Sequence, residues 1–260
     1  MKLTYESYLH LREILELQQP RSDPPEHDEM LFIVIHQTYE LWFKQLLHEL
    51  QRLCGLFDDG DLYAAIHTVK RMRTVMKTLV AQLDILETMT PMSFTSFRDR
   101  LDTASGFQSV QFRELEFALG YKRKDMLHYH AEGTPGREAL DRRLREPSVI
   151  DHFYRFLETR GAAMPRSLTG RDVTLPNEPD TQVQDGIYRL YGEDKSVAIL
   201  FELMTDFDEG IQEWRYRHVM LVARTIGEKH GTGGSLGVEF LKRSLFRPVF
   251  PDLWAIRHRL

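Results

Sequence analysis

The sequence predicts an all-α fold, and three observations support that prediction. Apolar residues recur at spacings of three, four and seven over most of the 260 residues, the pattern of helices with one buried face. Alternation of apolar and polar residues, typical of a half-buried strand, is nowhere sustained. No segment repeats at a fixed period or has the composition of a linker. We therefore expect residues 1–260 to form a single helical-bundle domain.

The first half of the chain contains the clearest helices. A first helix is indicated through Leu17 and closed by Pro20, and a second runs from near residue 27 to residue 53, with Gly55 as its stop. Asp61 is a suitable N-cap for the third helix, the most regular amphipath of the chain, which ends before Pro91. Two shorter helices are expected over residues 93–101 and 110–119.

The second half of the chain is less regular. Residues 131–185 contain many prolines and glycines, which predict a loop-rich segment around one helix near residues 148–160. Helical periodicity resumes at residue 183, is interrupted near residues 192–194, and continues through Phe207. We expect another helix over residues 210–227, a glycine-rich loop over residues 231–237, and a last helix from residue 238.

Composition excludes several classes of protein. The formal net charge of −5 argues against general attraction to nucleic acid or to acidic membranes. The single cysteine, Cys54, rules out an intrachain disulfide and the C-x-x-C-H motif that attaches haem covalently. No apolar run approaches the length of a membrane span, and the N-terminus lacks the pattern of a signal peptide. We therefore expect a cytoplasmic protein with no nucleic-acid or membrane partner.

His36 lies in the middle of the apolar segment 31–43. A buried imidazole without a hydrogen bond costs about 1–3 kcal/mol, so this position needs either a partner or a function. Taken alone, His36 is more often explained as a core histidine bonded to a backbone carbonyl.

A second histidine, His218, is followed by four apolar residues and preceded by Trp214 at a spacing of four, which places both side chains on one helix face. An apolar, aromatic-flanked helix face with a neutral imidazole is what noncovalent haem binding requires. A core histidine is again the alternative for this segment taken alone.

Other metal or nucleotide sites find less support. The chain has no Glu-x-x-His pair, which a carboxylate di-iron bundle needs on two helices. The glycine-rich loop lacks the Lys-Ser/Thr ending of a phosphate-binding loop, so a substrate lid with Thr232 as its polar side chain is the better interpretation. Arg98, beside Phe94 and Phe97, can hold a carboxylate with its planar guanidinium, although a surface ion pair is the commoner role.

Several short motifs follow one another in a specific order along the chain. They are YESYL at 5–9, HDEM at 27–30, FIVIHQTYELW at 32–42, FRD at 97–99, ASGFQS at 104–109, QFR at 111–113, WRYRH at 214–218, GTGGS at 231–235 and FPDLW at 250–254. In this order and over essentially the whole length, the chain closely resembles the tryptophan 2,3-dioxygenase family. The resemblance implies a haem b enzyme that inserts both atoms of O2 across the indole C2–C3 bond of L-tryptophan and yields N-formyl-L-kynurenine, the first step of the kynurenine pathway.

The resemblance also implies roles for particular residues. His218 resembles the proximal iron ligand and His36 the catalytic histidine on the substrate side. Arg98 would pair with the substrate carboxylate, and Thr232 would contact the amino-acid group as its loop closes. The remaining implied contacts are Phe32, Ile33, Val34, Ile35 and Phe94 for the substrate, and Ser105, Gly106, Trp214 and Arg113 for the haem. Phe94 stands where some bacterial members carry tyrosine, so one hydroxyl contact is expected to be absent.

Family members are homotetramers in which the N-terminal helix reaches a neighbouring active site. The resemblance therefore implies that Tyr5, Tyr8 and Leu9, within residues 1–20, are supplied to the substrate pocket of a second subunit. Two other classes of function stay open on the residues alone: a helical haem carrier or sensor without turnover, and a helical scaffold without a cofactor. Arg98 and Thr232 favour the enzyme, because a haem carrier does not need groups that hold an amino acid.

Overall fold

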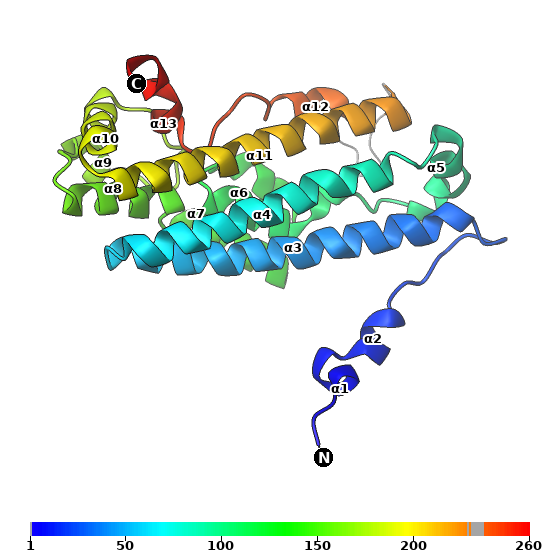
Figure 1. Cartoon of the computed structure of the whole chain (residues 1–260). Helices are drawn as coiled ribbons and strands as arrows, with labels where there is room; N and C mark the ends of the chain where they lie inside the picture. Colours follow the sequence, from blue (N-terminus) through cyan, green and yellow to red (C-terminus); the bar gives the residue numbers. More distant parts are fainter. Residues whose placement is uncertain (1, 228, 230–236) are drawn as a thin grey trace.

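The computed structural model describes residues 2–227, 229 and 237–260, and every element within them is helical. Three long helices run side by side along the molecule (Figure 1): α3 (His27–Asp58), α4 (Leu62–Leu86) and α11 (Lys195–Ile226). The all-α prediction is confirmed. None of the described helices, including the two of 32 residues, combines the length and the hydropathy that a bilayer crossing requires.

Shorter helices cover the long ones. On the remaining sides and at the two ends lie α5 (Pro91–Arg98), α6 (Val110–Ala118), α7 (Pro135–Arg145), α8 (Val149–Thr159), α9 (Arg166–Thr169), α10 (Thr181–Glu193), α12 (Val238–Lys242) and α13 (Pro251–Ala255). Short 3₁₀ helices occur at η1 (Asp99–Leu101), η2 (Gly106–Gln108), η3 (Lys124–Tyr129) and η4 (Ile256–Arg259). As Figure 1 shows, α5 lies at one end of the long helices and α10 at the other.

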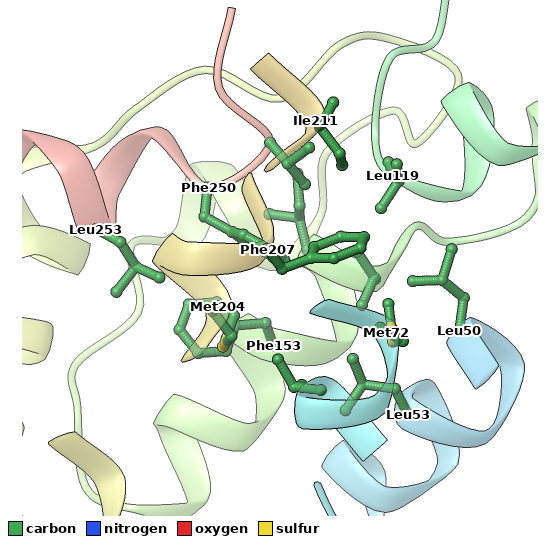
Figure 2. Close-up of a cluster of buried hydrophobic side chains, with 14 of the residues drawn as sticks. Leu50, Leu53, Met72, Leu119, Phe153, Met204, Phe207, Ile211, Phe250 and Leu253 are labelled. Atoms are coloured by element: carbon green, nitrogen blue, oxygen red, sulfur yellow. The ribbon is translucent and has the colours of Figure 1, made fainter. Parts of the chain in front are cut away.

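Helices that bury apolar faces against one another form the main core. Phe207 and Met204 of α11 meet Met72 of α4 and Phe153 of α8 at the centre of this cluster (Figure 2). These four side chains are at most 2% exposed. Because burying a large apolar side chain stabilises a fold by about 1.5–3 kcal/mol, this packing holds the long helices at fixed distances and gives the site a rigid frame.

Two glycines expected at helix boundaries, Gly55 at an end and Gly210 at a start, lie inside helices. The helix α3 continues through Gly55 to Asp58 because Phe57, which is fully buried, extends its apolar face. The helix α11 continues through Gly210, where an added Cβ would lie 3.3 Å from Cγ of Met76 on α4. The predicted break between residues 207 and 210 is therefore wrong. Gly210 allows α11 to approach α4 closely.

Two other segments differ from the expectation. The first predicted helix is divided into α1 (Tyr5–Leu9) and α2 (Leu11–Leu15), because His10 adopts a left-handed conformation with φ of 52°. Residues 131–185 hold α7, α8, α9 and the start of α10 rather than one helix, with irregular backbone between them. Pro135, one of the prolines from which the loop-rich segment is predicted, instead begins α7 at its first turn, where its missing N–H costs nothing.

The N-terminal arm, residues 2–17, contains α1 and α2 and lies away from the long helices (Figure 1). No residue of α1 or α2 is buried. The base of the arm is fixed by Gln18, whose Nε2 donates to Oε1 of Gln37 at 2.6 Å, and by Glu29, which accepts from the backbone N–H groups of Arg21 and Ser22. The arm therefore has an ordered base and an exposed tip.

Candidate active site

A cavity of about 290 Å³ lies between α3, α4, α5, α6, α11 and α12. It takes polar side chains from four of these six helices, although its wall is mainly apolar. The predicted site residues that line it are Phe32, His36, Phe94, Arg98, Ser105, Gly106, Arg113, Trp214 and His218. Residues separated by more than 180 positions in the sequence thus share one cavity.

His36 of α3 has one ring nitrogen in a hydrogen bond and the other available. Its Nδ1 lies 2.7 Å from the carbonyl oxygen of Phe32. Since a carbonyl only accepts, Nδ1 carries the proton, and in the neutral ring Nε2 holds the lone pair. Burial lowers the pKa of His36 below its ordinary value, against the opposing effects of the Phe32 carbonyl and Glu40. Neutral His36 is therefore a hydrogen-bond acceptor facing the cavity.

His218 of α11 is in a different environment. Its ring stacks on Trp214, with ring centroids 5.1 Å apart and planes within 4° of each other. It makes no hydrogen bond to any residue that the structure describes. Burial, together with the nearby His36 and Arg113, lowers the pKa of His218 to about 4. At neutral pH the imidazole is therefore uncharged and keeps a lone pair, which is the form that binds a metal ion.

Aromatic residues from two other helices fix the position of Trp214. Phe112 of α6 lies 5.2 Å from Trp214 between ring centroids, and Tyr39 and Phe43 of α3 approach it edge-on at 6.2 and 6.3 Å. The hydroxyl of Tyr39 donates to the carbonyl of Leu79 on α4 at 2.7 Å. Sequence reasoning missed Tyr39 as a cavity residue, although its spacing of three from His36 places both on one helix face.

At the α5 end of the cavity, an arginine is combined with a cluster of phenylalanines. Thr90 caps α5 and Pro91 begins it, and the fully buried Phe97 anchors it. Phe94 lies 5.7 Å from Phe32 between ring centroids. Arg98 follows Phe94 by four residues and lines the same cavity, half-buried. A cation at the edge of an apolar aromatic pocket is suited to an amphipathic ligand that carries an acid group.

The α6 side of the cavity is charged. Glu116 is 3% exposed and lies among the guanidinium groups of Arg113, Arg123 and Arg215. Burial alone would raise the pKa of Glu116, but these three arginines lower it below its ordinary value. The carboxylate is therefore ionised, and four charged groups share one buried wall. Sequence reasoning found only Arg113 of these four. Arg215 lies in the WRYRH motif without an assigned role, and Glu116 and Arg123 lie in none of the motifs.

Some predicted site residues do not line the cavity formed by the described residues. Val34 is 41% exposed, and Ile35 is buried in the main core. Ile33 of the same helix is half-buried. Tyr5, Tyr8 and Leu9 lie on the exposed N-terminal arm. Thr232 is outside the described residues.

Within the described part of the chain, no group of three or more His, Cys, Asp and Glu side chains could hold a metal ion. Among the described residues, His218 could therefore act only as a single protein ligand. One imidazole holds iron firmly where a macrocycle supplies the remaining in-plane ligands, as in haem proteins. The donor set thus fits haem, and it does not fit an iron or zinc ion held by protein side chains alone.

Comparison with known proteins gives the family. The profile of tryptophan 2,3-dioxygenase matches residues 1–160 and 183–260. The chain belongs to the tryptophan 2,3-dioxygenase family. The family match leaves out residues 161–182, and none of the described side chains of that stretch lines the cavity.

Named relatives agree with this assignment over nearly the full length. The chain is 53% identical to tryptophan 2,3-dioxygenase of Herpetosiphon aurantiacus over 255 residues, which cover 98% of this chain and 97% of the relative. It is 49% identical to the enzyme of Anaeromyxobacter sp. strain K, covering 99% and 96% of the two chains. The tryptophan 2,3-dioxygenase of Saccharopolyspora erythraea is 42% identical, with 98% and 92% covered. The family resemblance predicted from the motifs is confirmed.

Proposed function

We propose that the chain catalyses the oxidation of L-tryptophan by O2 to N-formyl-L-kynurenine, with haem b bound noncovalently in the cavity. Both oxygen atoms of O2 enter the product as the indole C2–C3 bond breaks. The observation that carries the proposal is the meeting of two neutral histidines, His36 and His218, from separate helices at one largely apolar cavity. Family membership supports the substrate and the reaction.

His218 is proposed as the iron ligand. Its neutral imidazole keeps a lone pair at physiological pH, and the parallel Trp214 ring fixes its orientation. When bound, haem supplies the binding and activation of O2, chemistry that protein side chains lack. Ser105, Gly106 and Arg113 line the same cavity and are proposed as further haem contacts.

His36 is proposed to orient the substrate. An indole N–H only donates a hydrogen bond, and Nε2 of neutral His36 only accepts. The hydrogen bond from Nδ1 to the Phe32 carbonyl fixes this tautomer. Phe32 and Phe94, which line the cavity, are proposed to hold the indole ring between apolar surfaces that exclude water. Ile33, Val34 and Ile35 do not line the cavity and are not proposed as substrate contacts.

Arg98 is proposed to bind the substrate carboxylate. A zwitterionic amino acid leaves water only when both charges find partners, because an unpaired buried charge costs several kcal/mol. The guanidinium can donate two parallel hydrogen bonds to a carboxylate. Thr232 is proposed as a contact of the amino-acid group.

We further propose that residues 1–260 form one domain and assemble as a homotetramer. Tyr5 and Tyr8 are 76% and 67% exposed, and Leu9 is 40% exposed, on an arm that lies away from the long helices (Figure 1). An arm with exposed aromatic residues and an ordered base is suited to packing on a neighbouring subunit. Tyr5, Tyr8 and Leu9 are accordingly proposed to complete a second subunit's pocket. The single cysteine supports the expected cytoplasmic location.

The test combines a spectrum with a product assay. The ferrous protein should show the Soret absorption of haem, and adding L-tryptophan under O2 should yield N-formyl-L-kynurenine. Tryptamine, which lacks the carboxylate, should react far more slowly. Absence of Soret absorption after reconstitution with haem would contradict the haem site. A normal haem spectrum without product would identify a haem carrier instead of an enzyme.

A further inference from the structure

The charged wall of the cavity, defined as Arg113, Glu116, Arg123 and Arg215, carries more positive than negative charge. Three guanidinium groups face one carboxylate. Glu116 contacts Nη1 of Arg113, lies 3.0 Å from Nη2 of Arg123, and lies 3.9 Å from Nη2 of Arg215. Among the residues that the structure describes, no other carboxylate comes within ion-pair distance of these arginines. The wall therefore has a surplus of two positive charges.

This surplus is buried. The side chains of Arg113 and Arg215 are 4% and 5% exposed, and that of Arg123 is 23% exposed. Aromatic rings lie against the guanidinium group of Arg113: its Cζ is 5.1 Å from the ring centroid of Phe107 and 5.2 Å from that of Phe112. Uncompensated charge in such surroundings is strongly unfavourable, so buried cations are normally paired with anions.

The wall also contains a donor without an acceptor. The Nε atom of Arg113 is buried and has no hydrogen-bond partner among the described residues. Arg215, by contrast, is held by neutral oxygens: its Nη1 donates to the Tyr121 hydroxyl at 2.7 Å and to the Arg247 carbonyl at 3.1 Å. These bonds fix the position of Arg215 and leave its charge unneutralised. All four charged side chains of the wall line the cavity.

We propose that the charged wall binds the two propionate carboxylates of the haem, with Glu116 as the positioning residue that holds the three guanidinium groups in place. This inference rests on the proposed haem function and goes beyond the assignment of Arg113 alone. Two carboxylates match the two surplus charges, and charge-assisted hydrogen bonds to carboxylates are the strong kind. The wall comes from α6, α11 and the turn after α6, whereas Arg98 comes from α5.

A double-mutant cycle between Arg123 and the propionates tests the inference. Haem and haem dimethyl ester, whose propionates carry no charge, are each bound by the full-length chain and by its Arg123→Met variant. Loss of the porphyrin to an excess of apomyoglobin is followed by Soret absorption. Losing one charge-assisted hydrogen bond should speed haem loss from Arg123→Met about tenfold. With the dimethyl ester, the variant and the parent chain should differ by less than twofold.

Two further variants separate this interaction from general damage to the fold. Arg123→Lys keeps the charge and should restore most of the haem retention. Arg171→Met removes another largely buried arginine, which pairs with Asp151 at 2.7 Å outside the cavity, and should leave haem loss unchanged. An equal effect of Arg123→Met on haem and on the dimethyl ester would overturn the inference, as would no effect on either.

The substrate carboxylate is the other possible anion. If the wall binds haem propionates, Arg123→Met should leave the KM for L-tryptophan within about twofold while haem retention falls. A raised KM with unchanged haem retention would assign the wall to the substrate and overturn the inference. If the parent chain took up no haem at all, the proposed function itself would fail, and that outcome is distinct from every result of the cycle.

Discussion

His36 on α3 and His218 on α11 occupy similar sequence contexts, since each is followed or surrounded by apolar residues of a long helix. Their environments differ. His36 donates to the carbonyl one turn earlier in its own helix, whereas His218 has no hydrogen bond to a described residue and stacks on Trp214. His36 is a hydrogen-bond acceptor in a fixed orientation, and the ring nitrogens of His218 are available to bind a metal ion. The difference shows that the hydrogen-bond partner, not the apolar context, decides what a buried histidine can do.

The largest expected effect is a difference in haem binding between variants of the two histidines. His218→Ala removes the proposed iron ligand and should speed haem loss by at least about a hundredfold, because a coordinate bond exceeds an ordinary hydrogen bond in strength. His36→Ala should retain haem. Soret absorption during transfer to apomyoglobin measures both. Full haem retention by His218→Ala with an unchanged ferrous spectrum would contradict the ligand assignment, and haem loss from His36→Ala alone would reverse the two roles.

The next effect tests whether the substrate is bound on the His36 side. Arg98→Ala should raise the KM for L-tryptophan roughly thirtyfold, because a buried carboxylate loses its charged partner. It should leave the haem spectrum unchanged and so resemble His36→Ala more than His218→Ala. The control is tryptamine, which lacks the carboxylate and should be turned over equally by the parent chain and the variant. A KM within twofold of the parent value would count against the carboxylate role.

A smaller effect tests the hydrogen bond from the indole. His36→Ala should lower kcat/KM for L-tryptophan about tenfold, the value of one lost hydrogen bond. Replacing the substrate by 1-methyl-L-tryptophan removes the N–H donor, so the parent chain should lose a similar factor. The variant should then discriminate less between the two substrates than the parent chain does. Undiminished discrimination would show that His36 does not accept from the indole.

The smallest effect concerns stability in acid. Folding lowers the pKa of His218 to about 4 from an ordinary value of 6.5 and lowers that of His36 as well. The unfolded chain therefore binds more protons between these values, and the stability contributed by the two neutral rings, complete above about pH 6.5, is lost as the pH falls toward 4.

This dependence is measurable by urea unfolding of the haem-free chain at pH 7 and pH 5. His218→Leu should reduce the loss of unfolding free energy between the two pH values by about 1–2 kcal/mol. His10→Gln, a change at an exposed residue of the arm, serves as the control for removing one histidine. An unchanged loss in His218→Leu would mean that the ring is not held neutral by burial.

Much of the site could be predicted from the sequence because its parts are local. Trp214 and His218 share a helix face at a spacing of four, and the same spacing joins Phe94 to Arg98. The order of the motifs indicates the family without any information about tertiary contacts. Helix boundaries were predicted less well, because glycine disfavours a helix interior, whereas Gly55 and Gly210 are retained within helices where neighbouring helices supply the packing.

The sequence by itself determined the all-α class, the family and the candidate histidines, since helical periodicity and motif order are properties of neighbouring residues. Only the tertiary structure decided which side chains face one cavity, how His36 and His218 differ, and that three arginines surround Glu116. The physical reason is that burial and pairing of charges depend on residues far apart in the chain. Arg113 and Arg215 are 102 positions apart in the chain. They come to share the carboxylate of Glu116 only when α6 and α11 lie close together in the fold.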